Sequence, residues 1–119
     1  MEPFQTVSEY LGYMQSHPEI ATCPIRRCLG VMGGKWKIFI VLQLFSAPAL
    51  RFGELARRVE GITNAMLSAS LRELERDGMV EREQFNEIPP HVEYSLTDKG
   101  KALLPVFCEL AKWGENNLD

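Results

Sequence analysis

The side chains with the most informative spacing lie between Thr63 and Arg72. On a helix that Thr63 caps, Leu67, Leu71 and Leu74 share one face. The opposite side and its flank carry small or polar side chains, namely Asn64, Ala65, Ser68, Ala69 and Arg72. Asparagine pairs with adenine, a hydroxyl donates or accepts, alanine contacts the thymine methyl, and arginine reaches guanine or a phosphate. The pattern favours a helix that reads base edges, and an ordinary amphipathic helix with a small polar solvent face is the alternative.

A cysteine offers a second candidate chemistry. Cys23 stands at the predicted start of a helix, and Arg26 and Arg27 follow it closely. A helix N-terminus and nearby cations lower the pKa of a thiol and so favour the reactive thiolate. The alternative for Cys23 is a partly buried structural thiol, because free cysteines are among the most buried residues. The other two cysteines, Cys28 and Cys108, fall on apolar helix faces, and we expect them in the core or in an interface.

Other kinds of site find no support in the sequence. Cys23 and Cys28 are five residues apart, and His17 and His91 belong to no zinc-ligand spacing. The pair Gly33-Gly34 is too short for a phosphate-binding loop, and no nucleophile and base are paired. We therefore expect no metal, no other cofactor and no enzymatic activity.

Composition and charge limit the classes of protein to which the chain can belong. The 119 residues are 45% hydrophobic and 24% charged, which indicates one globular domain, and the net charge of −3 taken alone argues against a nucleic-acid partner. The charge is unevenly distributed, since residues 22–82 hold ten basic and six acidic side chains between two acidic ends. No run of apolar residues is long enough to cross a membrane, and the first residues show no basic-then-apolar signal pattern, so we expect a cytoplasmic protein with reduced thiols and no membrane partner.

Apolar spacing predicts the order of the elements. Phe4, Val7, Leu11 and Met14 form one helical stripe that ends before His17, and we interpret this segment as a docking arm. A second helix follows over 25–32. The apolar run 35–45 fits either a buried helix or a buried strand, because its length favours the helix and its β-branched residues favour the strand.

The second half of the chain predicts two helices followed by a hairpin. A short amphipathic helix over 51–59 leads through the turn 60–62 into the helix of 63–77, which ends at Gly78. Strands over 79–85 and 91–96 then enclose an extended tip. Thr97 caps a final helix, and Pro105 is expected to kink it. Helix, turn, helix and hairpin is the order of a winged helix-turn-helix, a mainly α fold with a small β-hairpin.

A series of motifs from Cys23 onward carries a family resemblance, namely Cys23-Pro24, Gly33-Gly34-Lys35-Trp36, Arg51-Phe52-Gly53-Glu54-Leu55, Gly61-Ile62-Thr63, Met66-Leu67, the run from Leu71 to Val80, the run from Pro89 to Thr97, and Trp113-Gly114. By these motifs the chain resembles the HxlR-type branch of the MarR-like winged-helix regulators. The resemblance implies that the run 35–45 is helical. It also implies that Cys23 matches a thiol that senses electrophiles or disulfide stress in some members of the family.

The resemblance further implies a transcription factor that binds DNA as a homodimer. Residues 1–21 would form a dimerisation arm, and residues 22–119 would form a winged helix-turn-helix domain whose last helix completes the dimer interface. The dimer contacts would come from Phe4, Val7, Leu11, Phe107, Leu110 and Trp113. Two recognition helices would read a pseudo-palindromic double-stranded DNA operator. A winged-helix module that binds protein without DNA is the alternative function, and no small-molecule effector is indicated.

Four further residues enter as DNA contacts through this resemblance. Lys35, Arg51 and Arg57 would contact phosphates, although solvated helix ends are the alternative for them. The family's wing usually has Arg or Lys after the paired prolines, where this chain has His91. A neutral histidine is a weaker minor-groove ligand than arginine, so the wing is expected to bind more tightly once His91 is protonated.

Overall fold

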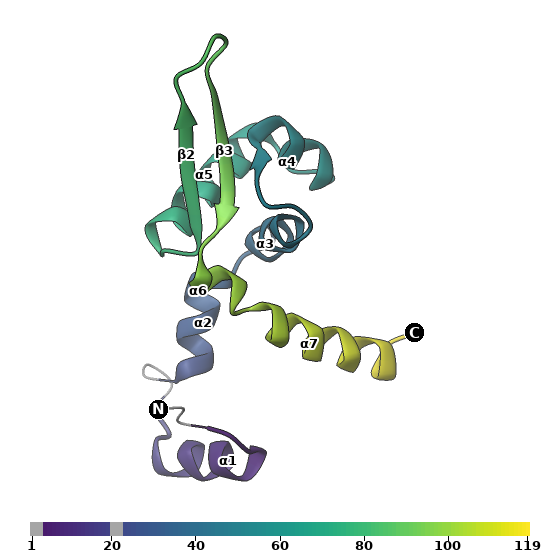
Figure 1. Cartoon of the computed structure of the whole chain (residues 1–119). Coiled ribbons are helices and arrows are strands. Elements are labelled where there is room, and N and C mark those ends of the chain that lie inside the picture. The colour runs from purple at the N-terminus through teal and green to yellow at the C-terminus, as the bar shows by residue number, and fades with distance from the viewer. Residues whose placement is uncertain (1–3, 20–22) are drawn as a thin grey trace. The chain divides into compact units, whose positions relative to one another are not determined.

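A computed structural model describes residues 4–19 and 23–119 of the chain. The chain divides into two compact units, Met1–Gly33 and Gly34–Asp119 (Figure 1). The predicted domain boundary between residues 21 and 22 lies outside the described residues. In the described ranges no single helix is long and apolar enough to span a membrane, although Pro24–Met32 and Lys37–Phe45 together reach that length and composition.

The first unit contains two helices, α1 (Val7–Ser16) and α2 (Pro24–Met32), as the apolar spacing predicts. The side chain of Thr6 caps α1 by accepting a hydrogen bond from the N–H of Glu9 at 3.1 Å. Phe4 precedes the helix, and its ring makes edge contacts with Tyr10 and Tyr13 at centroid distances of 5.0 and 4.8 Å. Phe4 is therefore packed within its own unit.

The first element of the second unit is the apolar run 35–45, for which the residue pattern fitted either a helix or a strand. The run forms α3 (Lys37–Phe45), as the resemblance implies. Its buried residues, Lys37, Ile40, Val41 and Leu44, repeat at helical spacing. Packing of one helical face against the core therefore outweighs the preference of the β-branched residues in this run for a strand.

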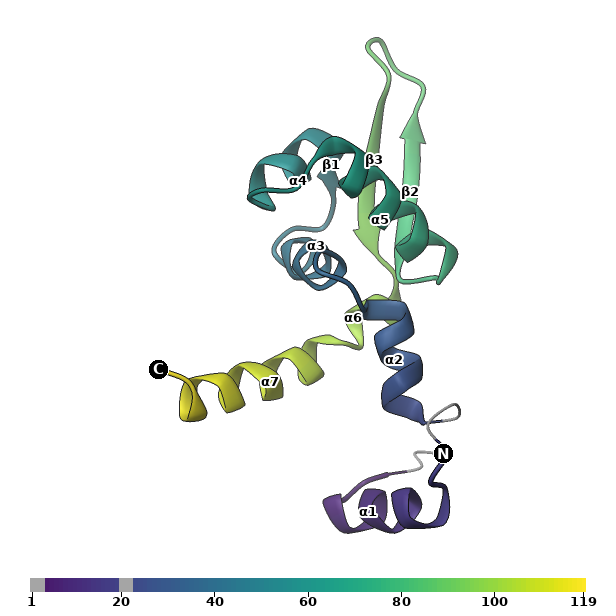
Figure 2. The ribbon, with the colours of Figure 1, turned by 180° about the vertical axis from the view of Figure 1, so that it is seen from behind.

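The helix pair and the hairpin follow as predicted, with one addition. The helices are α4 (Phe52–Arg58) and α5 (Asn64–Arg76), and the hairpin strands are β2 (Val80–Phe85) and β3 (His91–Leu96). A two-residue strand, β1 (Leu50–Arg51), was not predicted. It pairs with β3 to complete an antiparallel sheet of order β1-β3-β2. The hairpin passes in front of α5 in Figure 1 and behind it in Figure 2, and its tip extends beyond the helices.

The core of this unit lies between the helices and the sheet. Its side chains with almost no exposed surface come from α3, β1, α4 and α5, namely Ile40, Val41, Leu50, Leu55, Leu67, Leu71 and Leu74. The leucines of α5 are the predicted ones. They hold the helix against the domain by one face, so its other face is left to solvent.

The end of the chain differs from the prediction. A single kinked helix was expected, whereas the structure has two, α6 (Asp98–Lys101) and α7 (Leu104–Asn117). Pro105 is the second residue of α7, a position where its missing N–H leaves no hydrogen bond unmade. Gly100 of α6 lies against the carbonyl of Met79, and a Cβ there would clash with that backbone. The hydroxyl of Thr97 donates to the carbonyl of Gly78 at 2.6 Å, which fixes this junction to the start of the hairpin.

The cysteines also need a correction. Cys28 and Cys108 are exposed, so neither belongs to a core, and their predicted place in an interface remains a prediction. Cys23 is half-buried.

Candidate nucleic-acid interface

The turn between α4 and α5 presents the N-terminus of α5 to solvent. Gly61 has a φ of +89°, a conformation that a glycine adopts without strain. Two residues later, Thr63 caps α5, and its hydroxyl oxygen accepts from the N–H of Met66 at 3.1 Å. The turn and the cap together set the direction in which α5 leaves α4.

The predicted base-reading residues lie together on the outer side of α5. Thr63, Asn64, Ala65, Ala69 and Arg72 are exposed, and Ser68 is half-buried on the flank. The helix below them is anchored by its buried leucines. The arrangement is a rigid helix with a continuous face of small and polar side chains.

An ion pair that the sequence did not reveal ties α5 to α3. Lys37 is only 8% exposed, and its Nζ lies 2.8 Å from Oε2 of Glu73. The hydrogen bond from Lys37, followed by its charge, lowers the pKa of the Glu73 carboxyl below its usual value. A lysine at a buried position of an apolar helix was the available signal, but the spacing alone could not identify its partner.

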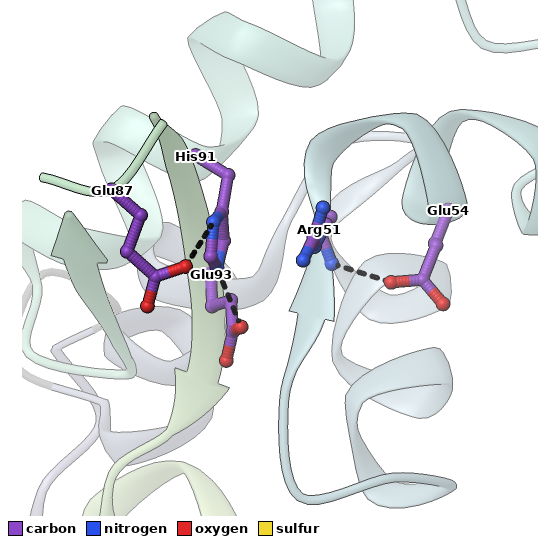
Figure 3. A network of polar contacts seen from close by, with 5 residues as sticks. All are labelled: Arg51, Glu54, Glu87, His91 and Glu93. Carbon is purple, nitrogen blue, oxygen red and sulfur yellow. Dashed lines mark hydrogen bonds and ion pairs between the residues drawn. The ribbon is translucent and has the colours of Figure 1, made fainter. Parts of the chain in front are cut away.

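The three basic residues predicted to contact phosphate are all exposed. Lys35 lies with its Nζ 4.8 Å from the centroid of the Trp36 ring. Arg51 stands immediately before α4, where its backbone N–H donates to the carboxylate of Glu54 at 3.0 Å (Figure 3). Arg57 is in the last turn of α4. Their accessibility is compatible with phosphate contacts and with solvated helix ends alike.

The wing histidine faces carboxylates of the hairpin. Nε2 of His91 is 3.0 Å from the Glu93 carboxylate, and Nδ1 is 3.9 Å from that of Glu87 (Figure 3). Its ring stacks on Phe85 with a centroid distance of 4.7 Å, and its side chain is 14% exposed. His91 therefore organises the hairpin near its tip, and a direct contact with DNA would require the ring to leave this setting.

The setting of Cys23 fits only part of the prediction. The pKa of its thiol is lowered by hydrogen bonds from the backbone N–H groups of Arg26 and Ile25, and more weakly by one from Tyr10. The start of α2 thus acts as predicted, whereas the lowering comes from backbone groups and not from the arginine charges. Burial and the neighbouring Cys23 raise the pKa of the Tyr10 hydroxyl. Tyr10 is a contact that sequence reasoning missed.

The predicted dimerisation residues divide into two groups. Val7 and Leu11 of α1 are 77% and 50% exposed, and Leu110 and Trp113 of α7 are 58% and 57% exposed. The other two, Phe107 and Phe4, make ring contacts within their own units: Phe107 with Phe45 at a centroid distance of 6.0 Å, and Phe4 with Tyr10 and Tyr13.

Within residues 4–19 and 23–119, no group of three potential ligands could hold a metal ion.

Comparison with known proteins gives consistent matches. A model of the HxlR-like helix-turn-helix family matches residues 31–119. An HTH-type transcriptional regulator of Halalkalibacterium halodurans is 43% identical over 112 residues, covering 94% of this chain and 96% of that protein.

Two solved regulators are similar in both structure and sequence. The redox regulator HypR in its reduced form superimposes with a TM-score of 0.75 at 43% identity, over 82% of this chain and 95% of that chain. The reduced form of the transcriptional regulator YodB from B. subtilis gives 0.73 at 33% identity, over 82% and 96% of the two chains. HypR has also been solved in an oxidised form, and YodB after treatment with diamide.

Proposed function

The chain belongs to the HxlR-like helix-turn-helix family of transcriptional regulators, and from that membership we propose that it binds a specific DNA operator as a homodimer. Its fold is the winged helix of MarR-family regulators, and its relatives are regulators and not enzymes. The observation that carries the proposal is the exposed polar face of α5 above its buried leucines. In this proposal α5 enters the major groove, with Asn64 and Ser68 at base edges.

A second copy of the chain is the partner that the apolar surfaces favour. Leu104, Val106, Leu110 and Trp113 of α7 are each more than half exposed, as is Val7 of α1. Several exposed apolar side chains on one helix favour an interface. A twofold dimer would place two copies of α5 in successive major grooves, about 34 Å apart, over a pseudo-palindromic site.

Control by a thiol is the second part of the proposal. Cys23 is partly accessible, and hydrogen bonds to its sulfur favour the thiolate. The names of HypR, a redox regulator, and of the diamide-treated YodB support redox sensing in a chain so similar to them. We place the protein in the cytoplasm, where DNA is available and the thiol is kept reduced.

A gel shift tests the DNA-binding proposal. The probe is duplex DNA from the region upstream of the protein's own coding sequence, at two salt concentrations. The proposal predicts a shifted band whose affinity falls steeply with salt, because phosphate contacts release counterions. Absent or salt-insensitive binding would favour the protein-binding module instead.

A further inference from the structure

A polar crevice separates α5 from the hairpin. Its volume is about 430 Å³, and it is lined by Ser68, Leu71, Arg72 and Glu75 of α5, Arg82 of β2 and Tyr94 of β3. Arg82 and Tyr94 are direct partners in the β2–β3 register, so they stand side by side on one wall. Arg72 stands on the opposite wall.

The crevice holds two arginines with no partner. In the part of the chain that the structure describes, neither Arg72 nor Arg82 forms an ion pair or a side-chain hydrogen bond, and both are exposed. One carboxylate, Glu75, lines the same crevice. The two guanidinium groups outweigh it, and the hydroxyls of Ser68 and Tyr94 add neutral donors. This chemistry suits an anion with several oxygen atoms.

The two faces of the hairpin carry different charges. Side chains alternate along a strand, so Arg82 shares its face with Val80, Gln84 and the cross-strand partner Tyr94. Glu81, Glu83 and Glu93 share the other face. The acidic residues of the two strands therefore point away from the crevice, and Arg82 is the charged residue of the strands on the face toward α5. An anion that approaches between α5 and the hairpin meets positive charge, whereas one that approaches the far face of the two strands meets Glu81, Glu83 and Glu93.

In a complex with DNA, the anion that could reach this crevice is a phosphate of the DNA backbone. In B-DNA a single phosphodiester strand separates the major groove from the adjacent minor groove. If α5 lies in the major groove and the wing lies over the minor groove, that strand passes between α5 and the hairpin. We propose that the crevice is a backbone phosphate site, in which Arg72 and Arg82 hold from two sides the strand that divides the grooves.

This inference rests on the proposed function and deepens it. It makes Arg72 a positioning residue for the backbone, where the sequence left guanine and phosphate both open. It also adds Arg82, which the sequence analysis did not assign to DNA. A phosphate contact fixes the register of the helix but carries no base information.

The test measures affinity against salt for two duplexes, the upstream region and an unrelated sequence of equal length. We expect Arg72→Ala and Arg82→Ala each to weaken binding to both duplexes about tenfold per protomer, and so about a hundredfold for a dimer, since each removes a charge-assisted hydrogen bond from both protomers. Each should also reduce the slope of log K against log salt by about one per protomer, and so by about two for a dimer. Asn64→Ala should weaken binding to the upstream duplex alone, because it removes a base contact.

Two further variants control for charge and folding. Arg76→Ala removes the same charge from the same helix outside the crevice, where Arg76 already pairs with Asp77 at 3.5 Å, and we expect almost no change in slope. Glu75→Gln removes the acid from the crevice, so we expect tighter binding to both duplexes. Thermal unfolding of Arg82→Ala should match the wild type, because the side chain is exposed and unpartnered.

The outcomes separate this inference from the function on which it rests. If the wild type binds neither duplex, the proposed function fails and the inference fails with it. If the wild type binds but Arg82→Ala keeps its full salt slope, or loses affinity only for the upstream duplex, the phosphate site is wrong while the function stands.

Discussion

The ammonium group of Lys37 lies 2.8 Å from the carboxylate of Glu73 and joins the buried side of α3 to the middle of α5. Lys37 is almost fully buried, whereas the side chain of Glu73 is 48% exposed. A buried ammonium is costly unless it is paired, so Glu73 is the partner that makes Lys37 compatible with the core. The helix α5 is thus held by a charge pair as well as by its leucines.

Removing Glu73 should therefore destabilise the protein more than replacing Lys37. Glu73→Ala leaves a buried charge without a partner, whereas Lys37→Met fills the same space with an apolar side chain. We expect a lower melting temperature for Glu73→Ala than for Lys37→Met in thermal unfolding followed by circular dichroism at pH 7. Equal melting temperatures for the two variants would show that leaving Lys37 unpaired carries no penalty.

The same pair predicts a dependence of stability on pH. Folding lowers the pKa of Glu73, so its stabilising effect is complete above the usual carboxyl pKa of about 4.3 and is lost as the pH falls through the lower value in the folded protein. The difference in melting temperature between wild type and Glu73→Gln should be largest near pH 7 and shrink toward pH 3. A difference that stayed constant over this range would contradict the lowered pKa.

The N-cap of α5 predicts the size of a loss in stability, because the cost of removing a capping side chain is known from other helices. Thr63→Ala removes the hydroxyl that accepts from the N–H of Met66, and we expect a loss of about 1 kcal/mol in the free energy of unfolding in urea. Thr63→Ser keeps the acceptor and serves as the matched control. A Thr63→Ala variant as stable as Thr63→Ser would mean that the cap does not stabilise the helix.

The thiol of Cys23 should react as a thiolate below the usual pH for cysteine. We would measure alkylation by iodoacetamide against pH in a protein carrying Cys28→Ser and Cys108→Ser, since both replaced thiols are exposed. Tyr10→Phe removes a hydrogen bond that lowers the pKa of Cys23, so the reaction profile should move to higher pH. An unchanged profile would show that Tyr10 does not lower the pKa of Cys23.

The regulatory role of that thiol needs a separate measurement. Diamide should change the DNA affinity of the wild type but not that of Cys23→Ser, as read by gel shift. An identical response in both proteins would show that Cys23 is not the thiol through which diamide acts.

The exposed apolar face of α7 predicts the oligomeric state. Leu110→Glu places a charge where a second copy is expected to pack, and it should convert a dimer into a monomer in light scattering at micromolar concentration. Lys112→Ala changes an exposed α7 residue that already pairs with Glu109 at 3.1 Å, and it should leave the mass unchanged. A wild-type protein that is strictly monomeric would contradict the dimer.

Local signals in the sequence predicted much of the fold. The cap at Thr63, the spacing of Leu67, Leu71 and Leu74, and the left-handed Gly78 place α5 almost to the residue. The apolar run before Pro48 was ambiguous because a short run of apolar residues fits a buried helix and a buried strand equally well. The strand β1 was missed because two residues are too few to show an alternating pattern.

Contacts between distant segments could not be predicted in the same way. The sequence marks Lys37 and Glu73 as charged but does not say that they meet. It likewise gives Arg72 and Arg82 no common site until the hairpin register places Arg82 on the side facing α5. The sequence also did not show that Glu87, Glu93 and Phe85 contact His91, whose role as a DNA ligand stays a prediction.

Hydroxyl-radical footprinting on the upstream duplex tests the central claim most directly, because it reports the contacted backbone nucleotide by nucleotide. We predict two protected half-sites whose centres are about 10 base pairs apart, or a multiple of that spacing, with protection lost for Leu110→Glu at the same protein concentration. Protection at a single half-site that Leu110→Glu retains, or no protection at all, would contradict an operator-binding homodimer.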